Sequence, residues 1–138
     1  MIKSFLVFIL LFTSNISADV ALFIPSFTNM DHYSEEYKEC YSDPHWTIVS
    51  MSICMNEEAD RQDALLNKEY KRTLKNLSDS RKKQLKNAHK AWVKYRNANC
   101  AWYNNIDGGT SAIVSGGQCY LNMTVSRLVE MNTEGFYD

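Results

Sequence analysis

The chain has 138 residues and a formal net charge of −1, and 22% of its residues are charged while 45% are hydrophobic. This length suits one domain rather than two, and the ordinary composition argues against a disordered chain. The balanced charge argues against a nucleic-acid-binding protein, which would need a strong positive excess. Few prolines and long stretches of Leu, Lys, Asn, Ala and Glu favour helices.

Residues 1–18 have the form of a secretory signal peptide. A short start that contains Lys3 precedes the unbroken apolar run from Phe5 to Phe12, and a mostly small or polar stretch then ends at Ala18. We expect cleavage after Ala18, because Ala is acceptable just before a cleavage site. The apolar run is too short to span a bilayer, and an uncleaved anchor helix is the alternative. The sequence therefore predicts an exported protein, periplasmic or secreted, without a membrane span in its mature form.

An N-terminal arm and a short helix are expected over residues 19–39. The arm starts apolar and breaks at Pro25, and its apolar side chains are expected to lie on the helices that follow. The short helix is expected over residues 31–42, with Asp31 as its N-cap and with Tyr33, Tyr37 and Cys40 (or Tyr41) at helical spacing. A second short segment is expected at residues 46–54.

Two long antiparallel helices are expected next, at residues 55–77 and 80–103, because only the turn Leu77–Ser80 separates them. Apolar residues recur along the first helix, namely Met55, Ala59, Leu66, Tyr70, Leu74 and Leu77. The second helix contains residues 88–100, which we interpret as the central element of the fold. Its buried face is expected to consist of Leu85, Ala88, Trp92, Tyr95 and Asn99.

Arg96 borders that apolar face and allows two interpretations. It is either a salt-bridged arginine at the rim or an arginine that reaches inward to a carboxylate and fixes how two helices meet.

Residues 104–118 are expected to form a long loop, because they hold four of the five glycines. The segment Gly108–Ser111 is either part of a plain connector or a cradle of backbone amides for an anion. No GK[ST] sequence follows it, so a nucleotide-binding P-loop is not supported. A last helix is expected from Cys119 to Asn132, followed by a frayed tail at 134–138.

Four cysteines, Cys40, Cys54, Cys100 and Cys119, are expected to form two disulfides, because their number is even and the chain is expected to be exported. Of the three possible pairings we favour Cys40–Cys54 and Cys100–Cys119, since each closes a short loop beside a predicted helix end. A metal site is disfavoured, because there is no CxxC pair and no histidine at ligand spacing. The predicted fold is therefore all-α: a small antiparallel bundle, with two long central helices and shorter N- and C-terminal ones, clipped by two disulfides.

Charge is distributed unevenly along the chain. Residues 31–43 hold five acidic residues against Lys38 alone, whereas residues 71–90 hold eight lysines and arginines against Asp79 alone. These charges are either ordinary solvated helix surfaces or a patch for an anionic partner such as a cell-wall polymer.

No catalytic site is predicted. The three histidines, His32, His45 and His89, lie in no recognisable nucleophile or metal motif, and His89 is expected to be solvated on a helix flank. With both cysteine pairs oxidised, no thiolate remains as a nucleophile. We therefore expect neither an enzyme nor a cofactor or metal site.

Four spaced motifs resemble the LprI-type lysozyme-inhibitor domain family, a family of small exported helical proteins. Asp63–Tyr70 is similar to D-x-x-L-N-x-x-Y, residues 88–100 to A-Q-x-A-W-x-x-Y-R-x-x-x-C, Gly108–Thr110 to G-G-S, and Cys119–Arg127 to C-x4-T-x2-R. The departures are mild: His89 stands where Gln is usual, Thr110 for Ser and Met131 for Leu. The resemblance covers about residues 40–131, within a helical domain expected at 40–133. It marks as family-motif positions Asp63, Leu66, Asn67, Tyr70, Trp92, Tyr95, Arg96 and Arg127.

The resemblance implies a protein that binds a lysozyme-type muramidase or a related wall-degrading enzyme. Candidate partner-binding residues are Asp107, Gly108, Gly109, Thr110 and Ser111, or the carboxylates of residues 31–43. The alternative is a bacterial cell-envelope module that inhibits nothing and binds cell-wall polymer through its basic stretch, or binds another protein. A third possibility, intermediate between an inhibitor and an envelope-binding module, is an immunity protein against a wall-degrading toxin.

Overall fold

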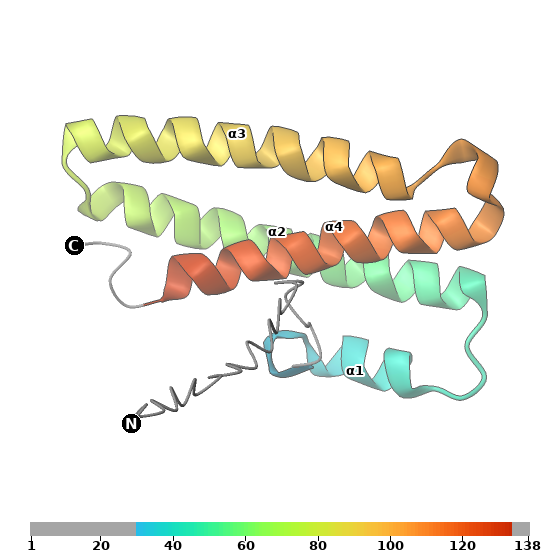
Figure 1. The fold of residues 1–138 in the computed structure, drawn as a ribbon. Helices are drawn as coiled ribbons and strands as arrows, with labels where there is room; N and C mark the ends of the chain where they lie inside the picture. The colour runs from blue at the N-terminus through green and yellow to red at the C-terminus, as the bar shows by residue number, and fades with distance from the viewer. Residues whose placement is uncertain (1–29, 134–138) are drawn as a thin grey trace, which may run out of the picture.

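The structure, a computed structural model, describes residues 30–133, and in this range all of its regular elements are helices, without strands. Its elements are η1 (Met30–His32), α1 (Glu35–Ser42), α2 (Ile48–Asn76), α3 (Asp79–Tyr103), η2 (Ile106–Gly108) and α4 (Gly109–Asn132). Figure 1 shows the α1–α2 connection and the α3–α4 turn at one end of the bundle and the α2–α3 turn at the other. The all-α prediction is confirmed. The predicted signal peptide, the arm up to residue 29 and the tail lie outside the described residues.

Helix α4 is the central element of the bundle. It packs most extensively on α2 and next on α3, while α1 packs on α2. Four of its side chains, Leu121, Thr124, Val125 and Met131, have no solvent exposure. The prediction that the helix containing residues 88–100 is central is therefore wrong. The C-terminal helix begins at Gly109 rather than at the predicted Cys119, so α4, with 24 residues, is only one residue shorter than α3.

The buried face of α3 is rotated from the predicted one. Leu85, Arg96 and Cys100 are its buried residues, whereas Ala88 is exposed and Tyr95 is 60% exposed. Trp92 and Asn99 are partly buried. The physical reason is that Arg96 takes the inward position, where it finds a carboxylate and two aromatic rings, so Tyr95 turns outward.

Helix α2 starts seven residues earlier than predicted and absorbs the separate segment expected at 46–54. Thr47 and Ser50 form a capping box, in which the Thr47 hydroxyl accepts from the backbone N–H of Ser50 and the Ser50 hydroxyl accepts from that of Thr47. Met51 and Met55 then continue the buried stripe toward Leu66. At the far end, Ser78 caps α3, as the sequence allowed.

Most of the loop predicted at 104–118 is the first half of α4. Only residues 104–108 connect the helices, and Gly109–Ser111 begin the new helix, with Gly108 at its N-cap position. Gly109 has a φ of 64°, a conformation that other residues rarely adopt, so it allows the chain to turn into α4. Gly116 allows α4 to approach the end of α3, because a Cβ there would lie 2.5 Å from Cβ of Asn104.

Helix α1 is held on α2 by a buried carboxylate. Ser34, and not Asp31 as predicted, is its N-cap, and its hydroxyl accepts from the backbone N–H of Tyr37. Ser34 donates its own N–H and hydroxyl to the Glu58 carboxylate, at 3.0 and 2.6 Å. Arg61 and Gln62 donate to the same carboxylate, at 2.9 and 2.7 Å. Burial raises the pKa of Glu58, but these hydrogen bonds outweigh it, so its pKa lies below the usual range.

Candidate functional site

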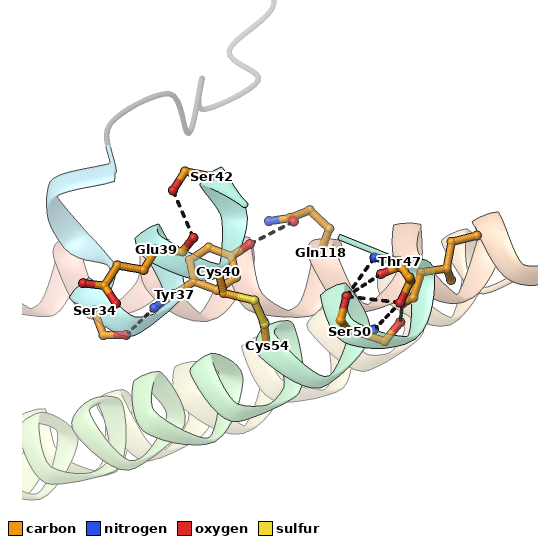
Figure 2. Close-up of a disulfide and its surroundings, with 11 residues drawn as sticks. Ser34, Tyr37, Glu39, Cys40, Ser42, Thr47, Ser50, Cys54 and Gln118 are labelled. Atoms are coloured by element: carbon orange, nitrogen blue, oxygen red, sulfur yellow. Dashed lines mark hydrogen bonds between the residues drawn. A yellow bond between two sulfur atoms is a disulfide. The ribbon is translucent and has the colours of Figure 1, made fainter. Parts of the chain in front are cut away.

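Both disulfides lie at the end of the bundle that holds the α1–α2 connection and the α3–α4 turn, which we call the disulfide end. Cys40 pairs with Cys54 and Cys100 pairs with Cys119, with Cα–Cα distances of 6.4 and 5.4 Å, so the predicted pairing is confirmed. In Figure 2, Tyr37 lies beside Cys40–Cys54 and its hydroxyl points to Gln118 of α4, to which it donates at 3.3 Å. Each cross-link therefore fixes one of the two connections.

The α3–α4 turn is braced from several sides. The Asn105 side chain accepts from the backbone N–H of Asp107 at 3.1 Å, and the Ser111 hydroxyl donates to the Gly108 carbonyl at 3.0 Å. The Cys100–Cys119 disulfide links the last turns of α3 to α4 and so holds the two helices on either side of the turn together. A segment held this way has little conformational freedom to lose when a partner binds it.

The predicted partner-binding residues Asp107–Ser111 are all exposed on this turn. Exposed apolar side chains flank them: Trp102 is 80% exposed, and Tyr103 and Ile113 are more than half exposed. Large exposed apolar groups gathered around one turn are typical of a contact surface for another molecule.

A cleft of about 730 Å³ opens beside this turn, and sequence reasoning did not find it. Its walls come from all four helices and from the α1–α2 connection, which contributes Trp46. The rings of Tyr41, Trp46 and Tyr103 line it, and Met51 and Met55 are buried in its wall. No sequence pattern indicates this cleft, because its lining residues are far apart along the chain.

Acidic and basic side chains gather at opposite ends of the bundle. The exposed carboxylates of Glu35, Glu36, Glu39, Asp43 and Asp107 belong to α1 and to the two connections. At the other end, around the α2–α3 turn, residues 68–94 carry only Glu69 and Asp79 as acids among many lysines and arginines. The disulfide end is therefore the acidic end, and it complements a basic partner.

Arg96 lies at the junction of three helices, which resolves the two interpretations in favour of the inward one. Its Nη1 donates to Asp63 of α2 and to Thr124 of α4, both at 2.8 Å, and only 6% of its side chain is exposed. Its guanidinium carbon lies 3.9 Å from the ring centre of Tyr120 and 4.8 Å from that of Trp92. This is an architectural site, because hydrogen bonds and cation–π contacts already occupy the arginine.

The other family-motif positions divide between the core and the surface. Leu66 is buried, and the Tyr70 ring stacks on His89. The Arg127 guanidinium lies 5.8 Å from the Trp92 ring centre. Asn67 and Tyr95 are exposed, so the structure gives them no packing role.

His89 is partly buried, which corrects the prediction of a solvated flank position. Its ring stacks between Tyr70 and Trp92, with ring centres 4.1 and 5.7 Å away. Burial lowers the pKa of His89, the nearby Arg127 and Arg96 lower it further, and Asp63 acts in the opposite direction.

The His89 environment predicts that stability falls below neutral pH. The folded-state pKa lies below the ordinary 6.5, so below pH 6.5 the unfolded chain binds a proton that the folded chain does not. The free energy of unfolding should therefore decrease as pH falls from 7.5 to 5.5, and His89→Gln should flatten this slope. Denaturant unfolding of both proteins at several pH values measures the effect. Equal slopes for the two proteins would contradict it.

Sequence reasoning missed two polar residues that the core depends on, Glu58 and Thr124, both without solvent exposure. Thr124 could have been found from its motif, where it lies five residues after Cys119. Glu58 offered no such signal, because it lies among other acidic residues at the predicted start of a helix.

Among residues 30–133, no helix combines the length and apolar character needed to cross a membrane. The same residues contain no group of three or more His, Cys, Asp or Glu side chains placed to hold a metal ion.

A family model described as "Lysozyme inhibitor LprI" matches residues 40–131, which is about two thirds of the chain. The chain belongs to the LprI lysozyme-inhibitor family. The match spans both disulfides, the Arg96 junction and the α3–α4 turn. The LprI family is an inhibitor family rather than a catalytic one, which fits the prediction of a non-enzyme. The two disulfides of this chain fit the prediction of an exported protein. No curated protein and no solved structure matched the chain.

Proposed function

We propose that this LprI-family protein is an exported, periplasmic or secreted inhibitor that binds a lysozyme-type muramidase or a related wall-degrading enzyme. In this proposal it is not an enzyme, and residues 40–133 form the functional domain. The α3–α4 turn, residues 104–111, is the element that enters the enzyme's cleft. The observation that carries the proposal is the braced turn itself, with exposed Asp107 at the acidic end of the bundle.

The physical argument concerns shape and charge. A glycosidase of this kind has a concave sugar-binding cleft, so its inhibitor needs a protruding element of small width. The turn after α3 is short, is cross-linked by Cys100–Cys119, and is flanked by exposed Trp102 and Tyr103. Preorganisation reduces the entropy lost on binding, and the acidic surroundings favour encounter with a cationic enzyme.

Reversing one charge on the turn tests the proposal. Asp107→Lys should raise the concentration needed for half-inhibition of the target lysozyme about tenfold or more, since a like charge is then forced against the enzyme. Asp79→Lys is the matched control, because it makes the same change in net charge at an exposed position at the opposite end of the bundle. Equal inhibition by both variants would remove the turn from the proposed interface.

A second candidate function is favoured by the basic surface of residues 68–94, at the end opposite to the disulfides. Here the protein is an envelope module that holds an anionic cell-wall polymer, without inhibition. The triple variant Lys82→Glu, Lys83→Glu, Lys86→Glu separates the two functions. It should leave lysozyme inhibition intact under the first and abolish polymer sedimentation under the second. Immunity against a wall-degrading toxin is a form of the first function with another target enzyme.

A further inference from the structure

The cleft beside the α3–α4 turn has the lining of a ligand site and is separate from the turn itself. Its volume of about 730 Å³ lies within the range of pockets that hold small ligands. None of the residues Asp107–Ser111 lines it. Its own chemistry therefore decides what it binds, independently of the proposed inhibition.

The mouth of the cleft carries three half-exposed aromatic rings from different parts of the fold. Tyr41 of α1, Trp46 of the α1–α2 connection and Tyr103 of α3 are 53%, 52% and 51% exposed. Such rings offer flat apolar faces together with a polar tip. Flat ligands that have apolar faces and polar edges, as sugar rings have, stack on surfaces of this kind.

The ligand must be uncharged where it contacts the cleft. Among the described residues that line it, none is Asp, Glu, Lys, Arg or His. A phosphate, carboxylate or ammonium group would lose its water there without gaining an opposite charge, which is costly. This excludes anionic and cationic ligands from the interior of the cleft.

Neutral hydrogen-bonding groups are held in place along the α4 side. Gln118 donates to Asn122 at 2.6 Å, and the hydroxyl of Tyr33 donates to the same Asn122 oxygen at 3.0 Å. Ser115 and Ser126 also line the cleft. A purely aliphatic ligand would cover these amides and hydroxyls without replacing their water, so an amphipathic neutral ligand is favoured.

Asn99 gives the most specific indication. It is partly buried in the cleft lining, and its side-chain nitrogen donates only to sulfur atoms within the described residues, to Cys119 and Met123, both at 3.5 Å. Sulfur is a weak acceptor, so a ligand carbonyl oxygen would be a better partner. Met123 lies beside Asn99, and Met51 and Met55 line the same cleft, so the cleft offers adaptable apolar surface suited to a small methyl group. A carbonyl beside a methyl group is an acetamido group.

We propose that this cleft binds a neutral glycan, a short run of N-acetylated hexosamine units. The aromatic rings at the mouth stack on the sugar rings. The Asn99 amide donates to an acetamido carbonyl, whose methyl group lies on the methionines. Gln118 and Asn122 bind sugar hydroxyls. This site is distinct from the basic surface around the α2–α3 turn, which would attract anionic polymer.

Calorimetric titration of the oxidised protein with the β-1,4-linked tetramer of N-acetylglucosamine tests the proposal. The corresponding glucose tetramer should bind about tenfold more weakly, because it lacks the acetamido groups. Trp46→Ala should weaken binding of the N-acetylated tetramer about tenfold, and Asn99→Leu several-fold. Trp102→Ala should leave it unchanged; this matched control removes an exposed tryptophan that does not line the cleft.

A second measurement uses only the unaltered protein. The side-chain amide signals of Asn99, Gln118 and Asn122 should shift in a ¹H–¹⁵N spectrum when the N-acetylated tetramer is added. Absence of binding, or binding that Trp46→Ala leaves intact, would overturn the proposal. The proposal would also be overturned if the protein bound a neutral octyl ether but not the N-acetylated tetramer, since the cleft would then be a site for an aliphatic chain. None of these readouts involves a lysozyme, so they fail or succeed independently of the proposed inhibition.

Discussion

Arg96→Ala should lower the free energy of unfolding by about 2–4 kcal/mol, because it removes a buried, hydrogen-bonded cation, while its carboxylate partner Asp63 is 35% exposed and can regain water. The loss has identifiable parts. Asp63 loses its cation, Thr124 loses a donor, and the rings of Trp92 and Tyr120 lose the guanidinium that lies between them. Three helices meet at this point, so their packing should loosen together.

Denaturant unfolding with the disulfides intact measures this cost. Lys94→Ala is the matched control, because it removes an exposed cation two residues away on the same helix, and its effect should be within about 0.5 kcal/mol. The double variant Arg96→Ala, Asp63→Ala should be more stable than the sum of the single changes predicts. A cost for Arg96→Ala as small as that of the control would show that Arg96 is a surface residue.

Glu58→Ala should cost a similar amount, about 2–4 kcal/mol, because it leaves the buried Gln62 and the partly buried Ser34 without their acceptor, while Arg61, which is 40% exposed, can turn to water. Ser34, Arg61 and Gln62 all donate to this carboxylate, which has no solvent exposure. The N-terminal attachment of α1 to α2 should weaken most, since Ser34 is also the N-cap of α1. Relative to the unaltered protein, Glu58→Ala should speed up amide hydrogen exchange more in α1 than in α3, which would show this weakening directly.

The exposed neighbour Glu57 provides the control, and Glu57→Ala should leave the unfolding midpoint nearly unchanged. The sign of the pH effect is also fixed. Because the folded-state pKa of Glu58 is below its ordinary value, its contribution is present above about pH 4.5 and is lost as pH falls through the folded pKa. Equal unfolding midpoints for the Glu58 and Glu57 variants would contradict the proposed role of the buried carboxylate.

The helices, the disulfide pairing and the family could be predicted because each depends on local patterns. Met55, Leu66 and Leu77 recur at helical spacing and are buried as expected, and the short segment after Leu77 does turn the chain back. The cysteine pairs close short segments beside helix ends. These features depend on residues that are close in sequence.

The first half of α4 could not be predicted, because its residues are poor helix formers. Residues 104–118 contain four glycines together with Ser, Thr, Ile and Val, and such a composition indicates a loop. Tertiary packing overrides this preference. Ala112 and Gly116 are buried in the first turns of α4, and the absence of a Cβ at Gly116 lets α4 lie against Asn104 at the end of α3.

The phase of α3 and the cleft were missed for a related reason. Hydrophobicity alone places Tyr95 inside and Arg96 outside, whereas three partners from other helices hold Arg96 inside. Those partners are distant in sequence, and so are the rings of Tyr41, Trp46 and Tyr103 at the cleft. Residues Asp107–Ser111 are exposed in the structure, and their role in binding a partner stays a prediction, although Gly109 serves to start a helix rather than to form a loop.

The most direct test of the proposed function is the residual activity of several types of lysozyme, each mixed with increasing amounts of the purified, oxidised mature protein. We predict a dose-dependent loss of activity of at least one lysozyme that reaches completion at a defined molar ratio. Reduction of the two disulfides should abolish that inhibition by releasing the turn. Full activity of every lysozyme at a large molar excess of the oxidised protein would contradict the inhibitor function, although the helical fold would stand.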